Sequence, residues 1–353
     1  MRSLLRSVTL SVAFATLVAL ATIVHAQPRP AARELKIAIL LGSSGPSDTG
    51  FNDAALAGLD AAKKNGRISV AVRPAPRPDE YDATIDRLAA DAPDLTIGVG
   101  VLYTEPFRAA STRHPRTRFL LLDADLPNLA NVRSVTFRAD EGSFLAGVAA
   151  AGESKHGHIG FIGGMSMPSI QAFECGYETG ARWAAKELFR TVRGHAAYIG
   201  TTPDAFSDPK HAAELSRVMI AQHEVDVLYA AAGASGLGVI AAARHAKMKA
   251  IGVDADQRHV APETVITSMR KRLDRAVESA IADVRKQSFR GGVTIMNLAN
   301  GGVDLVLPGS LAPKTKTLVE KARAAIVSGR AQPCVKDEEK PPAWNFPPRP
   351  AAP

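Results

Sequence analysis

Short apolar runs alternate with amphipathic stretches along most of this chain. Runs of four to six residues with the apolar character of buried strands occur at 36–41, 68–72, 95–99, 119–122, 159–162, 196–199, 225–230 and 250–253. Apolar residues at helical spacing occupy 53–65, 81–90, 140–151, 170–189, 209–222 and 238–245. A strand followed by a helix, repeated many times, predicts parallel sheets with helices on both faces, so we expect an α/β fold.

The number of strands predicts two Rossmann-like lobes rather than one. About 300 folded residues are more than a single compact core accommodates, and the first four strands and the next four would each form one sheet. A strand at 266–269 would lead the chain back to the first lobe, where a helix at 273–287 and a strand at 293–298 would pack. This predicts an N-terminal lobe of 34–154 plus 270–305, a C-terminal lobe of 155–269 plus 306–335, and a hinge that the chain crosses more than once.

Both ends of the sequence differ from its interior. Arg2 and Arg6 precede an uncharged stretch at 7–24, and small residues around Ala26 come before Gln27. This pattern predicts a secretory signal peptide at 1–26 and a linker at 27–33. Because no cysteine follows the apolar stretch, we expect a periplasmic protein without lipid attachment. The Pro-rich segment 340–353 predicts a disordered tail.

Charge and catalytic motifs narrow the class of protein. The net charge of +8 comes from basic residues interleaved with Asp and Glu, so nucleic-acid binding is not expected. Nucleophile-elbow and P-loop patterns are incomplete, and His156 and His158 lack the companions of a metal site. We therefore predict neither an enzyme nor a metal or other cofactor. Cys175 and Cys334 are the only cysteines, and the sequence leaves open whether they pair.

Polar residues and glycines gather where several predicted strands end. Open α/β sheets bind ligands at the carboxyl ends of their strands. Asp123 follows the fourth strand, a Gly-rich turn containing Gly233 follows the seventh, and Asp254 follows the eighth. The turn at Gly233 opens a helix whose backbone N–H groups would face ligand hydroxyls. By chemistry alone, Asp123 is as well suited to capping a turn as to binding a ligand.

Several segments resemble one receptor family, in that family's order. They are Glu141-Gly-Ser-Phe-Leu-Ala-Gly-Val-Ala-Ala, Gly160-Phe-Ile-Gly-Gly, Phe173-Glu-Cys-Gly-Tyr-Glu-Thr-Gly, Gly252-Val-Asp-Ala-Asp-Gln and Thr267-Ser-Met-Arg-Lys. They are similar to the basic membrane protein family, whose members are substrate-binding proteins of ABC importers, best known for purine nucleosides. The resemblance covers residues from about 35 to 329 and implies a type I periplasmic binding protein fold.

In the first lobe, the resemblance implies a binding site for the purine base. The segment from Asp48 to Asn52 is similar to the family's Asp-x-x-Phe-Asn pattern, in which the aromatic residue stacks on the purine. Phe51 would take that role, with Asp48 and Asn52 shaping the site. Asp123 would bond the nitrogen edge of the base. The alternative for Phe51 is a ring tucked under its own loop.

In the second lobe, the resemblance implies the second aromatic plate and a ribose site. Tyr177 would stack on the other face of the base, and Asp254 and Lys271 would bond the ribose. The helical spacing also fits Tyr177 as a core residue beside Phe173. Phe206 is expected at the rim of the site only.

The sequence leaves open which of three consecutive cations faces the ligand, and which class of ligand binds. Lys271 lies between Arg270 and Arg272, so any one of the three cations could be a solvated surface charge. We expect a purine base or nucleoside as ligand, an ABC permease as partner, and a monomer. The alternatives are a ligand-sensing periplasmic subunit of a membrane receptor, or a binding protein for a non-purine small molecule.

Overall fold

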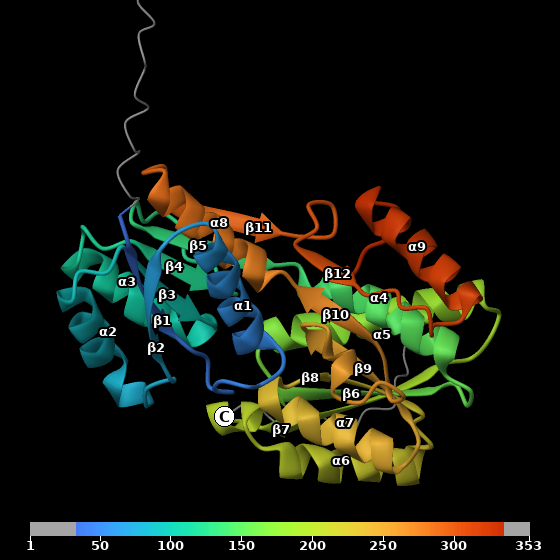
Figure 1. The fold of residues 1–353 in the computed structure, drawn as a ribbon. Coiled ribbons are helices and arrows are strands. Elements are labelled where there is room, and N and C mark those ends of the chain that lie inside the picture. The colour runs from blue at the N-terminus through green and yellow to red at the C-terminus, as the bar shows by residue number, and fades with distance from the viewer. Residues whose placement is uncertain (1–32, 335–353) are drawn as a thin grey trace, which may run out of the picture. The chain divides into compact units, whose positions relative to one another are not determined.

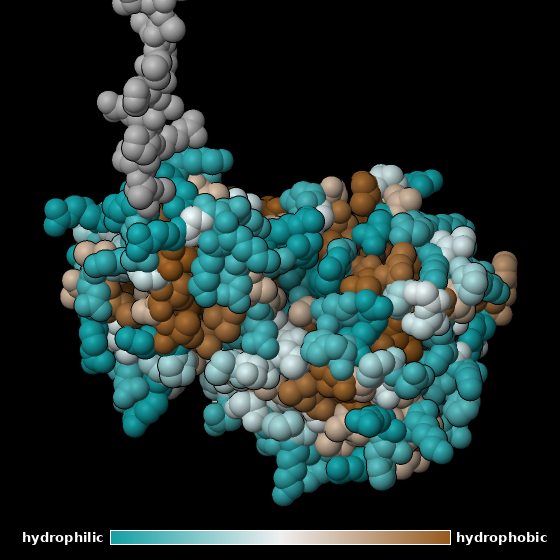
Figure 2. All heavy atoms as spheres, viewed as in Figure 1, coloured by the Kyte–Doolittle hydropathy of each residue, from teal (hydrophilic) through white to brown (hydrophobic). Residues whose placement is uncertain are grey.

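The computed structural model describes residues 33–334. The predicted signal peptide, nearly all of the linker, and the Pro-rich tail lie outside these residues. None of the helices within 33–334 combines the length and apolarity needed to cross a bilayer. On the face shown in Figure 2, hydrophilic residues cover most of the surface and apolar residues form separate patches.

The first sheet has the strand order β11-β5-β4-β3-β1-β2, with every pair parallel. Its strands are β1 (Leu35–Leu40), β2 (Ile68–Arg73), β3 (Leu95–Val99), β4 (Phe119–Leu122), β5 (Val132–Phe137) and β11 (Gly292–Met296). Both faces are covered, because alternate residues of β1 pack on different helices. Ile37 and Ile39 share a core with α1 (Phe51–Lys64) and α8 (Leu273–Arg285), which lie side by side in Figure 1. Ala38 and Leu40 share another core with α2 (Tyr81–Ala90) and α3 (Thr104–Arg113).

The second sheet has the strand order β12-β10-β9-β8-β6-β7. Its strands are β6 (His158–Met165), β7 (Arg193–Gly200), β8 (Val227–Ala231), β9 (Lys249–Asp254), β10 (Val265–Lys271) and β12 (Val303–Leu305). Only β12 runs antiparallel to its neighbour. The helices of this lobe are α4 (Ala139–Glu153), α5 (Pro168–Glu187), α6 (Pro209–His223), α7 (Gly236–His245) and α9 (Pro313–Val327). Helices α6 and α7 pack on each other, and α4 packs on α5 and α9.

The predicted α/β fold with two lobes is confirmed, and each predicted strand and helix has a counterpart within a few residues. The sequence pattern missed the strands β5 and β12 and the helices α3 and α9. Strand membership also departs from the predicted division, since β12 joins the second sheet although 270–305 was expected in the first lobe. Likewise α4, expected in the first lobe, packs on helices of the second. The chain passes between the sheets three times, after β5, after β10 and after β11.

Helices α4 and α5 cross in close contact because glycines lie at the crossing. The small residues of α4 pack mainly on this second helix. A Cβ on Gly147 would lie 2.0 Å from the carbonyl oxygen of Tyr177, and one on Gly180 would lie 2.0 Å from that of Phe144. Gly176 makes the same kind of contact with Asp140, at 2.2 Å. This close packing fixes α5, whose N-terminal half carries Phe173.

The two cysteines form a disulfide. The Cα atoms of Cys175 and Cys334 are 5.3 Å apart, within the range that such a bond requires. The bond joins α5 to the segment that follows α9, across a loop of 159 residues. It therefore ties the end of the described chain to the helix that carries Phe173.

At the crossing of α4 and α5, we expect a Gly→Ala substitution to destabilise the protein, whereas in an ordinary helix it is stabilising. Alanine normally stabilises a helix relative to glycine, but the new methyl group of Gly180→Ala would overlap the Phe144 carbonyl. We expect Gly180→Ala to lower the free energy of unfolding by about 1–3 kcal/mol in urea titrations. The matched control is Gly236→Ala in α7, because the nearest atom to its Cβ would be 3.6 Å away. If both variants unfold like the parent protein, the crossing is not as close as described.

Candidate functional site

A cavity lies where the carboxyl ends of the two sheets face each other. Most of its walls come from residues at or just after the carboxyl ends of β1, β3 and β4 in the first lobe and β6, β8, β9 and β10 in the second. This is the position at which open parallel sheets present ligand-binding loops. Most of the lining is apolar or aromatic, and its ionisable groups, apart from two tyrosines, are Asp123, Asp254 and Lys271.

Lys271 is the buried cation at the centre of this cavity. The residue is 3% exposed, and its Nζ donates a hydrogen bond to Asp123 Oδ2 at 2.7 Å. Because Lys271 ends β10 and Asp123 follows β4, this ion pair joins the second lobe to the first. The ammonium also lies 4.4 Å from the ring centre of Phe173 and 5.6 Å from that of Phe51. At these distances both rings stabilise the charge through their π faces.

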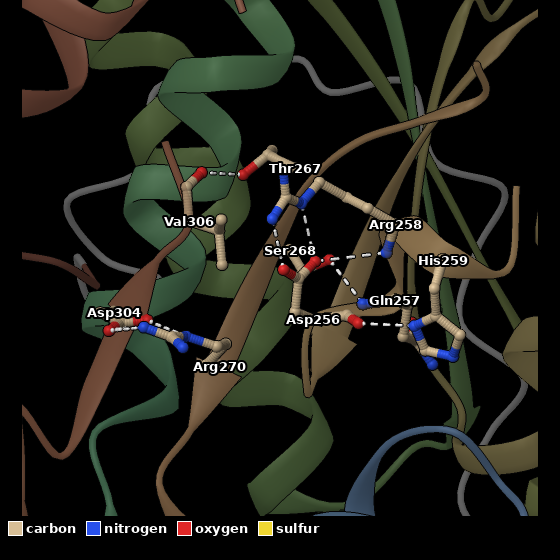
Figure 3. Close-up of polar contacts among 9 residues, drawn as sticks. All are labelled: Asp256, Gln257, Arg258, His259, Thr267, Ser268, Arg270, Asp304 and Val306. Carbon is tan, nitrogen blue, oxygen red and sulfur yellow. Dashed lines mark hydrogen bonds and ion pairs between the residues drawn. The ribbon is translucent and has the colours of Figure 1, made fainter. Parts of the chain in front are cut away.

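Arg270 and Arg272 are not part of the cavity wall, so of the three consecutive cations only Lys271 lines the site. Arg270 forms a two-pronged ion pair with Asp304 on β12, as Figure 3 shows. Arg272 forms a similar pair with Asp274 at the start of α8. Successive residues of a strand point to opposite sides, so Lys271 alone of the three is directed inward.

Asp254 is a buried carboxylate that is only partly satisfied. It is 7% exposed, and its Oδ1 has no hydrogen-bond partner among the described residues. Burial raises the pKa of Asp254 to about 7, with Lys271 opposing the rise and Asp123 and Asp48 adding to it. Both Asp254 and Asp123 have positive φ angles, 65° and 61°, which non-glycine residues adopt at an energetic cost. Such strain at two carboxylates in one cavity is typical of functional sites.

Asp48 and Asn52 hold the loop after β1 rather than line the cavity. Both are fully buried, and neither belongs to the cavity wall. Asp48 accepts hydrogen bonds from the backbone of Gly50 and Asn52 and from the hydroxyl of Ser44. The Asn52 side chain bonds both backbone groups of Gly42. The loop is therefore fixed from within, and it presents Phe51 and Ser44 to the cavity.

The structure does not place Tyr177 as an aromatic plate. Tyr177 is 1% exposed and packs in the core beside Tyr229 and Phe161, with ring centres 5.1 and 6.3 Å away. The cavity wall instead contains Phe173, one helical turn earlier on α5. The two residues share one face of the helix, and only the one nearer the N-terminus reaches the cleft. The helical spacing of the sequence had allowed this core position as the alternative to stacking on the base.

Gly233 and Phe206 both line the cavity, as do residues that the sequence did not single out. The additional lining residues include Tyr81, Tyr103, Met165 and Met167. Met165 ends β6 and Met167 lies two residues beyond it, so their position at a strand end was the available signal. Tyr103 is harder to find, because it belongs to a short 3-10 helix after β3.

The described residues contain no group of three His, Cys, Asp or Glu side chains arranged to hold a metal ion. His158 stacks on His195, and His195 stacks on His223 with ring centres 4.3 Å apart. Burial lowers the pKa of His195 to about 4, so His195 is neutral at pH 7.

Comparisons with known proteins agree on one family. Residues 36–332 match the family described as ABC transporter substrate-binding protein PnrA-like. "Basic membrane protein A" of Borreliella burgdorferi is 32% identical, over 70% of this chain and 72% of that protein. The "ABC transporter nucleoside-binding protein BmpA" of Lactococcus lactis subsp. cremoris is 30% identical over 84% and 88%. The crystal structure of an ABC transporter solute-binding protein from Aeropyrum pernix K1 superposes with a TM-score of 0.78 at 27% identity, covering 84% of this chain and 92% of that one.

Two neighbouring aspartates give opposite predictions for stability against pH. The pKa of Asp254 rises from 3.8 to about 7 on folding, so its contribution to stability is lost as the pH rises between these values. Asp254→Asn should therefore become more stable than the parent protein from pH 4 to pH 7 and keep this advantage above pH 7. Urea titrations across this pH range measure the difference.

Asp256→Asn is the matched control. Hydrogen bonds from Arg258, drawn in Figure 3, hold the pKa of Asp256 below its ordinary value. The ionised Asp256 carboxylate therefore stabilises the fold at neutral pH, and this stabilisation is lost as the pH falls through the lowered pKa. Asp256→Asn should be less stable than the parent at pH 7, with the difference shrinking in acid. Equal pH profiles for the two variants would contradict the burial of Asp254.

Proposed function

This chain belongs to the PnrA-like family of ABC transporter substrate-binding proteins, and from that premise we propose that it binds a purine nucleoside or purine base between its lobes. The observation that carries the proposal is the cavity itself. Phenylalanine rings from both lobes, two carboxylates and one ammonium group border the same pocket. A flat ring with polar edges has the matching chemistry, and the relative from Lactococcus lactis is named as nucleoside-binding.

Phe51 and Phe173 supply the stacking surfaces. Both lie within 6 Å of the Lys271 ammonium, so their rings border the same space. Every purine has a π face on each side, and stacking on an aromatic side chain contributes about 1–3 kcal/mol per base. Because each lobe supplies one ring, a base that touches both stabilises the closed arrangement over an open one.

The carboxylates supply the polar recognition. Asp123 accepts N–H donors from the edge of the base, and Asp254 accepts hydroxyl donors of the ribose. When the base occupies Asp123, the Lys271 ammonium turns toward Asp254 and the sugar, so that its charge stays paired. A ligand without a donor for Asp123 would leave that carboxylate without a partner, which disfavours it strongly.

The charge balance of the site favours a neutral ligand. Lys271 is paired with Asp123 and is also attracted by Asp254, and Asp48 adds a third carboxylate close by. Phosphates and other anions would meet this negative surplus in a buried setting, where charges are poorly screened. Nucleosides and free bases fit these electrostatics better than nucleotides do.

The biological role follows from the family and the N-terminal sequence. We propose that residues 1–26 direct export to the periplasm, where the protein acts as a monomer without a lipid anchor. The closed, ligand-bound form then delivers its ligand to the permease of an ABC importer.

The proposed ligand class is tested by thermal unfolding of the exported form, residues 27–353, against bases, nucleosides, nucleotides, sugars and amino acids. Unfolding and refolding beforehand removes any copurified ligand. A ligand at a hundred times its Kd should stabilise by about 2.7 kcal/mol, a shift of several degrees. We expect shifts with purine nucleosides or bases and none with their monophosphates. A shift with sugars or amino acids alone would keep the fold and overturn the ligand.

The proposed role of Phe173 as the second stacking surface can be tested with a matched control, Tyr177, on the same helix. Phe173→Ala should weaken purine binding roughly 5- to 150-fold, since it removes one stacking surface. Tyr177→Phe should leave affinity unchanged, because it removes only a buried hydroxyl without a described partner. Isothermal titration calorimetry measures both. Loss of binding in Tyr177→Phe with normal binding in Phe173→Ala would reverse the assignment.

A further inference from the structure

We infer that Gln257 is a positioning residue that links closure of the lobes to the ligand carboxylate Asp254, through a hydrogen bond to Thr49 of the opposite lobe. The inference rests on the proposed function, in that the cavity must bind a ligand on closure. Gln257 is not part of the cavity wall. Its effect on the ligand would therefore be exerted through the two segments that it joins.

Gln257 is firmly held within its own lobe. It is 3% exposed, and its backbone N–H donates to Ser268 Oγ on β10 at 3.0 Å, next to the ion pairs of Figure 3. Its side-chain Oε1 accepts the backbone N–H of Val253 at 2.9 Å. A backbone N–H can only donate, so this contact fixes which end of the amide is the oxygen. The Nε2 group must then point the other way.

The Nε2 group points across the interface between the lobes. It donates to the Thr49 hydroxyl at 3.1 Å. Thr49 has a positive φ of 55°, and its own N–H donates to Asp53 Oδ2 at 2.9 Å, so the hydroxyl is presented by a constrained loop. Next to it, a Cβ on Gly50 would lie 3.3 Å from the Val253 carbonyl oxygen. The loop and the end of β9 are thus in close contact around this hydrogen bond.

One amide therefore touches both halves of the ligand site. On one side it holds Val253, the residue before Asp254, whose backbone has the strained positive φ. On the other side it holds Thr49, two residues before Phe51. The bond thus fixes the backbone that carries the carboxylate relative to the loop that carries the stacking ring. Since the partners lie on different lobes, the bond is lost when the lobes separate.

This arrangement predicts a kinetic signature. A contact that exists only in the closed form slows the release of ligand and has little effect on its capture. Removing it should raise the dissociation rate constant and leave the association rate constant nearly unchanged. A neutral hydrogen bond of ordinary net strength corresponds to a change of about two- to tenfold.

The test uses the pair Thr49→Val and Thr49→Ser. Valine keeps the branched shape at the constrained φ and removes the hydroxyl, whereas serine keeps the hydroxyl. Stopped-flow measurements with the purine that most stabilises the parent should show release about two- to tenfold faster in Thr49→Val, unchanged capture, and parent-like release in Thr49→Ser. A cycle with Gln257→Ala should show that Thr49→Val has no further effect once Gln257 is absent.

The other outcomes separate the inference from the proposed function. If the parent binds purines and Thr49→Val releases them at the parent's rate, the inference is overturned and the proposed ligand stands. If Thr49→Val slows capture instead, or Thr49→Ser behaves like it, the loop has a structural role only and the inference is again overturned. If the parent binds no purine, the proposed ligand fails, and the same release measurement is made with the compound of the thermal panel that most stabilises the parent. Faster release in Thr49→Val than in Thr49→Ser then supports the inference, and equal release rates, or no binding of any compound, overturn it.

Discussion

The site depends on the burial of one ammonium group between two lobes. A charge removed from water is stable only when it is paired, and Lys271, 3% exposed, finds its direct partner Asp123 on the other lobe. Separating the lobes would return both groups to water, and bringing them together desolvates both. The relative position of the lobes therefore determines whether these two charges are paired and buried or separate and solvated. A second carboxylate, Asp254, and three phenylalanine rings, Phe51, Phe137 and Phe173, also lie near the ammonium.

The fold meets this requirement by placing each group at a strand end and fixing the supporting elements. Asp123 and Asp254 follow parallel strands and have strained backbone angles, which only firmly packed neighbours can maintain. Phe173 is held through α5, whose glycines allow the close crossing with α4 and whose Cys175 is bonded to Cys334. The helix crossing and the disulfide thus lie behind the site, while the ion pair between the lobes lies within it.

Much of the fold and part of the site could be predicted from the sequence. Strands buried on both faces give continuous apolar runs, so most were found, whereas β12 has only three residues and leaves no such signal. Phe51, Asp123, Asp254 and Lys271, which the resemblance implied as site residues, all line the cavity. Tyr177 was misplaced because residues one helical turn apart have the same periodicity, and only the distance along α5 to the cleft distinguishes it from Phe173. The disulfide needed a distance in space, which spacing along a chain does not contain.

In the proposed function, the Lys271–Asp123 pair also limits which ligands the cavity can select. An incoming molecule must replace the ammonium on Asp123 with a donor of its own, because an ionised carboxylate left buried without a donor is costly. The released ammonium must in turn find an acceptor, and Asp254, whose Oδ1 has no described partner, is the group placed to receive it. Ligand recognition is then an exchange of partners within a fixed set of charges. A neutral molecule with N–H and O–H donors completes this exchange, whereas an anion would compete with the carboxylates for the single cation. The same balance that closes the lobes therefore determines the chemical class of what they enclose.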